Sequence, residues 1–192
     1  MTEILDMIQK FDESVLLLIQ ELIRQPWMDG FWKAVTHLGD GAWLWILLSL
    51  LLLIPRKTRK AGAAALIALA VGGLITNVAL KNLVARIRPY DRMAELILLI
   101  ETQHDFSFPS GHTCASFAAA CGMYHVLGKK QGIPLLILAV LISLSRLYVG
   151  VHYPSDVAVG AAVGILAGWA GWKAAELFQR KHCRKTPQDR LM

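Results

Sequence analysis

The chain alternates long hydrophobic runs with short polar segments, and the lengths of the runs predict membrane-crossing helices. Residues 61–80 contain no charged side chain. At about 1.5 Å per residue, a helix of that length spans a hydrocarbon core of about 30 Å. Four further runs are candidate membrane-crossing helices: residues 33–54, 113–127, 133–148 and 157–178. We therefore predict an all-α fold, a polytopic membrane helix bundle of about five transmembrane helices.

Residues 1–30 show a different pattern, in which hydrophobic positions recur at helical spacing and charged residues interrupt them. This pattern predicts an amphipathic helix that lies in the membrane interface. Pro26 is expected to end the helix, with Trp27 and Trp32 anchoring it at headgroup level. No basic start followed by an apolar stretch and a cleavage site is present, so we expect no removable signal peptide.

Composition supports a membrane protein over a soluble helical bundle. Hydrophobic residues make up 55% of the chain and charged residues 18%, and the mean hydropathy is +0.47. We find no internal repeat or long linker, which predicts one domain over residues 1–192. Within it we expect an interfacial helix (1–30), a transmembrane bundle (31–178) and a basic cytoplasmic tail (179–192).

Basic residues gather at three places: residues 56–60, residues 129–130 and the segment 173–185. Five crossings put all three on one side, and the positive-inside rule makes that side cytoplasmic. Residues 81–110 and 147–156 then lie together on the extracytoplasmic side. This topology accounts for most of the net charge of +6 and the pI near 9.4. A nucleic-acid partner is therefore not expected.

The first polar cluster follows the uncharged run. Lys81 and Arg88 are seven residues apart, about two helical turns, so both are expected to point the same way. Pro89 is expected to end that helix. Arg86 lies off this face and is interpreted as a surface cation. Cations that extend to the membrane interface are the alternative reading of this cluster.

The second cluster is Pro109-Ser110-Gly111-His112. Pro109 disfavours helix before it, and Ser110 is a good N-cap for the span that follows. Amide groups at such a helix start bind phosphate oxygens. Gly111 admits the ligand close to the backbone, and His112 is placed beside the bound anion. An ordinary helix cap with an incidental histidine is the alternative.

The third cluster is Ser145-Arg146, then His152 and Asp156 four residues later. A carboxylate on one ring nitrogen of His152 fixes the tautomer and leaves the other nitrogen as a nucleophile. Charged groups at a membrane boundary are costly to keep without a task. A purely structural His–Asp pair is the alternative reading. Together the clusters offer what is needed to hold a phosphate, attack it and protonate the leaving group.

In this order and spacing, the three clusters resemble the signature of the type-2 phosphatidic acid phosphatase superfamily, which includes bacterial undecaprenyl-diphosphatase and phosphatidylglycerophosphatase members. The resemblance covers residues 81–156. It implies that His152 attacks phosphorus to form a phosphohistidine, that Asp156 orients it, and that His112 protonates the leaving oxygen. It also implies that Lys81, Arg88 and Arg146, with Ser110 and Gly111, bind the phosphate oxygens.

The expected function is hydrolysis of a lipid phosphate or diphosphate at the extracytoplasmic face, with undecaprenyl diphosphate as the first candidate substrate. Phosphatidylglycerophosphate and phosphatidate follow. The alternatives of another class are an anion transporter and an inactive membrane scaffold. No metal or other cofactor is expected, since the chain offers no acidic cluster for magnesium and no Cys-x-x-Cys pair.

Three features remain outside this scheme. His37 precedes the first predicted span and His104 lies in the outer loop, and neither is expected to act directly in the chemistry. The apolar stretch 93–100 is too short to cross the bilayer. We expect it to form a small interfacial helix over the site. The pattern leaves the oligomeric state and the source organism open.

Overall fold

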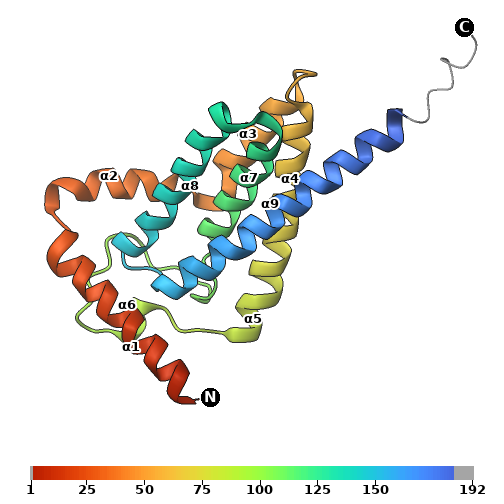
Figure 1. The fold of residues 1–192 in the computed structure, drawn as a ribbon. Coiled ribbons are helices and arrows are strands. Elements are labelled where there is room, and N and C mark those ends of the chain that lie inside the picture. The colour runs from red at the N-terminus through yellow and green to blue at the C-terminus, as the bar shows by residue number, and fades with distance from the viewer. Residues whose placement is uncertain (1, 184–192) are drawn as a thin grey trace, which may run out of the picture.

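The structure, a computed structural model, describes residues 2–183, and these are helical without any strand. The all-α prediction is confirmed for this part of the chain (Figure 1). The elements are α1 (Thr2–Leu18), η1 (Ile19–Ile23), α2 (Pro26–His37), η2 (Asp40–Ala42), α3 (Trp43–Leu53), α4 (Arg59–Gly73), η3 (Leu74–Leu80), α5 (Lys81–Val84), α6 (Pro89–Arg92), α7 (Gly111–Leu127), α8 (Lys129–Tyr148) and α9 (Pro154–Cys183).

Helix α7 occupies the centre of the bundle and packs against α4, α8 and α9 (Figure 1). Its buried positions are mostly small, which permits close helix approach. Larger side chains fill the space toward α3 and α8, where Trp45, Met123 and Ile142 are fully buried in one cluster. The indole nitrogen of Trp45 donates a hydrogen bond of 2.9 Å to Ser116. A buried polar ring atom is thereby satisfied.

Helix α9 meets α7 and α4 through a line of glycines. A Cβ atom on Gly160, Gly164 or Gly171 would come within 2.7 Å of a backbone carbonyl oxygen of α4, of α7 or of Ser110, the N-cap of α7. No side chain fits in that space, so the helix backbones touch directly. This glycine line fixes α9 against the middle of the bundle.

Three helical stretches are long and apolar enough to cross a membrane: Arg59–Arg92, Lys129–Tyr148 and Pro154–Arg180. A fourth arises if Pro26–His37 and Asp40–Leu53, which are bent by 46°, form one broken span. Five crossings are therefore not confirmed. The predicted first span is interrupted because Gly41 and Ala42 adopt positive φ angles, which no helix accommodates.

The N-terminal region contains two helices where one was predicted. The break falls at Arg24, which is extended, and Pro26 begins α2 instead of ending α1. Pro is favourable at a first helical position because its missing N–H has no helical partner there. Helix α1 buries Leu16 and Asp12 and exposes apolar side chains such as Phe11. Its location in the membrane interface stays a prediction.

The loop after α6 covers the end of the bundle where α5 ends and α7 and α9 begin (Figure 1). The helix predicted over residues 93–100 is wrong, since this stretch has no regular helix. Its apolar residues are explained by tertiary packing: Met93 and Leu96 are buried against Leu16 and Tyr153. At the opposite end, α9 continues to Cys183, past the predicted start of the tail. Residues 184–192 lie outside the described part of the chain.

Candidate functional site

Lys81 and Arg88 meet at the site end of the bundle, although the helical repeat is not what brings them together. The helix ends at Ala85, which has a φ of +48°, and Arg88 is an extended residue immediately before α6. Pro89 accordingly begins a helix, contrary to the prediction that it ends one. Both cations are largely buried, and both bind the same carboxylate, that of Asp105.

Asp105 lies in the loop that covers the site, and no motif in the sequence predicted its role. Its two carboxylate oxygens pair with the Lys81 ammonium and the Arg88 guanidinium, and Arg88 Nε also donates 2.8 Å to its backbone oxygen. Partial burial opposes ionisation of this carboxyl group, but the two cations outweigh burial and lower its pKa to about 2. The Asp105 carboxylate thus pairs with two of the cations, Lys81 and Arg88, that were predicted to bind phosphate.

The third cation, Arg146, comes from the last turn of α8 and is 1% exposed. Its Nη1 atom donates to the Thr36 hydroxyl group, whereas Nε and Nη2 are buried without a hydrogen-bond partner within residues 2–183. Unpaired buried donors cost free energy. A bound anion would relieve that cost, so these two donors mark the place where an anion fits.

The turn before α7 forms as predicted. Ser110 is the N-cap of α7, and its hydroxyl oxygen accepts hydrogen bonds from the amide and the hydroxyl group of Thr113. The Ser110 hydroxyl proton remains available to a ligand. Gly111 lies close to the side chain of Lys81, because a Cβ placed on it would be 3.9 Å from Nζ. His112 follows in the first turn and lies 2.8 Å from Asp40 through Nε2.

His152 is buried and sits next to Asp156, with 3.6 Å between Nδ1 and Oδ2. The Ser107 hydroxyl is 3.5 Å from the same ring nitrogen. Nε2, on the opposite edge of the ring, is therefore the nitrogen left for a substrate. Burial is the main cause that lowers the pKa of His152 to about 3, and Arg88 and Arg146 add to the effect. The ring is neutral at ordinary pH, which is the nucleophilic form.

The Asp156 carboxylate has more hydrogen-bond and ion-pair partners than the His152 ring has. Its Oδ2 atom accepts from the Ser107 hydroxyl and from the Tyr153 amide at 3.0 Å, and its Oδ1 atom pairs with Arg86 at 2.6 Å. Its backbone oxygen accepts from the Ser110 amide at 3.1 Å, which ties the second motif to the third. The carboxylate is therefore fixed from three elements of the chain.

The interpretation of Arg86 as a surface cation is wrong. Its side chain is 16% exposed and bridges Asp156 and Asp12, with 2.7 Å from Nη2 to the Asp12 Oδ2 atom. Asp12 itself is fully buried and also accepts from the Ser155 amide at 2.9 Å. Helix α1 is thereby attached directly to the start of α9. The contacts of Asp12 with Arg86 and with Ser155 could not be predicted from the sequence, because they join segments far apart in the chain.

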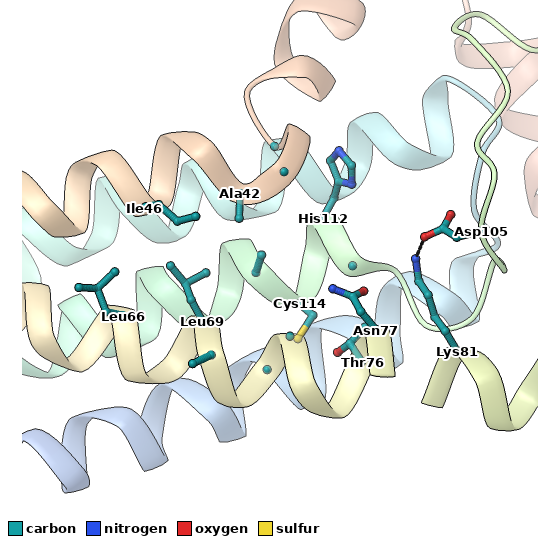
Figure 2. A pocket seen from close by; sticks show the side chains of 17 residues that line it. Ala42, Ile46, Leu66, Leu69, Thr76, Asn77, Lys81, Asp105, His112 and Cys114 are labelled. Carbon is teal, nitrogen blue, oxygen red and sulfur yellow. Dashed lines mark hydrogen bonds and ion pairs between the residues drawn. The ribbon is translucent and has the colours of Figure 1, made fainter. Parts of the chain in front are cut away.

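A cavity of about 580 Å³ begins beside Lys81, Gly111 and His112 and continues into the bundle, whereas His152, Arg88 and Arg146 are buried and do not line it. Figure 2 shows its two ends: Lys81, Asp105 and His112 at one end, and Leu66, Leu69 and Ile46 at the other. One end thus carries charge and the other is apolar. A ligand that fits both ends is amphiphilic, with an anionic group and a hydrocarbon chain.

These features define a class of protein: a helical membrane protein with a candidate anion site at one end, where three cations, two histidines and several carboxylates lie together. Residues 61–180 match the PAP2 superfamily, and this range includes all three motif clusters. The chain belongs to the PAP2 superfamily, so the resemblance inferred from the motifs is confirmed.

Three relatives illustrate the family. Decaprenylphosphoryl-5-phosphoribose phosphatase of Mycobacterium tuberculosis (strain CDC 1551 / Oshkosh) is 38% identical, over 81% of this chain and 85% of that protein. Undecaprenyl-diphosphatase of Sulfolobus acidocaldarius is 32% identical, over 76% and 69%. The crystal structure of a transmembrane PAP2 type phosphatidylglycerolphosphate phosphatase from Bacillus subtilis superposes with a TM-score of 0.71 at 28% identity, over 91% and 87%. Family and helices together establish an integral membrane protein whose relatives are named phosphatases.

Proposed function

We propose that this protein is a lipid phosphatase, and that the two-ended cavity is where the lipid phosphate binds. The observation that carries the proposal is the continuity between the charged end at Lys81 and His112 and the apolar end at Leu66 and Leu69. At the charged end a phosphate would meet Lys81 and His112, while the hydrocarbon chain stays in an apolar environment. An anion path through a transporter needs charges along its length, and here the apolar end has none among its lining residues.

In the first step, Nε2 of His152 attacks phosphorus in line with the bond to the leaving oxygen. An N–P bond forms while the P–O bond breaks, and a proton from His112 goes to the departing oxygen. Asp156 holds the attacking ring and stabilises the positive charge that develops on it. Lys81, Arg88 and Arg146 stabilise the phosphoryl oxygens, so fixed cations supply the charge that a metal ion supplies elsewhere.

In the second step, a water molecule attacks the phosphohistidine. His112, now neutral, takes the proton of that water as the new P–O bond forms. The N–P bond breaks, and the His152 ring returns to its neutral form as inorganic phosphate leaves. The mechanism is balanced without an external oxidant, reductant or co-reactant.

Among lipid phosphates, undecaprenyl diphosphate is the substrate we propose first. The names of two relatives at 38% and 32% identity describe polyprenyl-linked phosphates, which supports a prenyl chain. Phosphatidylglycerophosphate and phosphatidate follow, supported by the name of the structural relative from Bacillus subtilis.

Phosphate release by the purified protein in detergent tests the proposal. We expect inorganic phosphate to appear from undecaprenyl diphosphate faster than from phosphatidylglycerophosphate or phosphatidate. Millimolar EDTA should leave the rate within about twofold, because the proposed charge stabilisation comes from side chains. Activity that vanishes with EDTA and returns only with a divalent ion would contradict the metal-free mechanism. Phosphate flux across proteoliposomes without phosphate release from any lipid would favour the transporter. The absence of both release and flux would favour the scaffold.

A second prediction concerns Asp105, which must leave Lys81 and Arg88 before a phosphate can take its place. Asp105→Asn is expected to tighten inhibition by orthovanadate about fivefold, since a half-exposed ion pair contributes on the order of 1 kcal/mol. The measurement is the vanadate inhibition constant for phosphate release. Asp91→Asn, an exposed carboxylate on α6, is the control and should leave that constant unchanged. Weaker vanadate binding in Asp105→Asn would mean that the carboxylate positions the cations and does not compete for them.

We also propose that the site faces the extracytoplasmic side and that the chain ends in the cytoplasm. The basic segments 56–60 and 129–130 lie at the end of the bundle away from the site, because α4 and α8 both run from those segments toward it (Figure 1). This arrangement agrees with the positive-inside rule. Labelling of single cysteines placed at Lys57 and at Gln103 in intact cells would distinguish the two sides.

A further inference from the structure

The turn that joins α2 to α3 lies against the site, although it belongs to none of the three motifs. Thr36 accepts a hydrogen bond from Arg146. Gly39 leaves room for the His112 ring, because a Cβ there would come within 2.7 Å of the ring atom Cδ2. Asp40 binds the same ring. Three positions within five residues thus touch residues assigned to the chemistry.

Asp40 bridges two histidines through its two carboxylate oxygens. Oδ1 lies 2.8 Å from Nε2 of His112, and Oδ2 lies 2.8 Å from Nδ1 of His37. The side chains of Asp40 and His37 are 53% and 63% exposed, and that of His112 is 17% exposed. Because Nε2 of His112 faces the carboxylate, Nδ1 is the nitrogen left to exchange a proton with a substrate.

We infer that Asp40 is a positioning residue for the proton-transfer step, which fixes the His112 ring and stabilises its protonated form, while His37 holds the carboxylate in place. The inference rests on the proposed function, in which His112 protonates the leaving group. It assigns the turn 36–41 as a fourth segment of the site. The same logic orients the histidine of a serine-protease triad, where a carboxylate holds the ring without taking the proton.

The charges around His112 determine in which direction the loss of the Asp40 charge changes the pKa of this histidine. Burial is the largest influence and lowers the pKa of His112, and the charges of Arg146 and Lys81 lower it further. Asp40 opposes all three. Beyond it, a neighbouring cavity of about 540 Å³ brings Lys33, His37 and Glu101 toward the same ring. Removing the charge of Asp40 therefore lowers the pKa of His112, so the acid form is lost at a lower pH.

The test compares parent, Asp40→Asn and His37→Gln on two substrates across pH. Dioctanoyl phosphatidate has a poor alkoxide leaving group that needs a proton, and p-nitrophenyl phosphate has a good one that does not. For Asp40→Asn we expect kcat on phosphatidate to fall about 10- to 100-fold, part of what a general acid contributes, and kcat on the aryl ester to fall less than about fivefold. The alkaline limb on phosphatidate should move down by about one pH unit. His37→Gln should shift it in the same direction by less.

Several outcomes overturn the inference. Equal losses on both substrates with an unmoved alkaline limb would show that Asp40 is only structural. If Asp40→Asn does not fold, His37→Gln decides, because His37 is exposed and its one side-chain hydrogen bond among residues 2–183 is to Asp40. An unchanged pH profile in His37→Gln then contradicts the inference.

His112→Ala separates this inference from the function on which it rests. If His112→Ala loses activity on phosphatidate while Asp40→Asn matches the parent on both substrates, His112 is the acid and the role given to Asp40 is wrong. If His112→Ala keeps the parent rates on both substrates, the proposed acid itself is wrong. The two failures are thus distinguishable in one set of measurements.

Discussion

Replacing His152 with alanine is expected to lower phosphate release by at least about 10⁴-fold, the scale of loss seen when a nucleophile is removed. His152 is buried next to Asp156, and its pKa of about 3 keeps the ring neutral and ready to attack. Alanine offers no atom that can bond to phosphorus, so no phosphoenzyme can form. The measurement is the initial rate on undecaprenyl diphosphate, together with acid-labile phosphate bound to the protein after a rapid quench.

His125→Ala is the matched control for this prediction. His125 is exposed near the far end of α7, where its ring stacks on Trp172. It should retain activity within about twofold, because surface substitutions away from such sites have small effects. Phosphate release by His152→Ala at a rate close to that of His125→Ala would remove His152 as the nucleophile, while leaving the fold and family unaffected.

Arg86→Met is expected to destabilise the protein by about 3–5 kcal/mol, the range for removing one partner of a buried ion pair. The change leaves the carboxylates of Asp12 and Asp156 without their shared cation, and both are almost completely buried. It also removes the stacking of the guanidinium over the Tyr153 ring, at 3.9 Å from the ring centroid. Equilibrium unfolding of the detergent-solubilised protein measures the loss.

Arg92→Met provides the comparison, because Arg92 also binds a carboxylate of α1 but does so at the surface. Its side chain is 55% exposed and pairs with Glu13 at 2.9 Å. Exposed pairs contribute between about 0 and 1 kcal/mol, so this variant should stay close to the parent. Equal unfolding free energies for the two variants would show that the buried bridge to α1 is not a main support of the fold.

The sequence predicted the helices of the bundle well because their hydrophobic runs are long and uninterrupted. The run 133–148 lies within α8 and the run 157–178 within α9, and Ser110 caps α7 as expected. The three motif clusters were also expected to meet, and the structure brings them to one end. This meeting was predictable because many charged residues at the ends of membrane helices are costly unless they act together.

The contacts that sequence reasoning missed have a common physical cause. Arg86 was judged by its place on a helix, but the backbone leaves the helix at Ala85, so helical spacing no longer describes residues 86–88. Asp12, Asp40 and Asp105 pair with cations or histidines far along the chain. Periodicity reports the local environment of a residue, and such pairs depend on the tertiary fold.

The line of glycines along α9 is expected to limit where the proposed lipid substrate can enter. Because Gly160 lies against the backbone of Ser110, the helix that carries Asp156 packs in direct backbone contact with the start of the helix that carries His112. We therefore expect the proposed catalytic residues Asp156 and His112 to keep their relative positions while substrate enters from another side. The apolar end of the cavity lies between α3 and α4. A long prenyl tail is therefore expected to enter laterally from the bilayer between these helices, without movement of the two histidines.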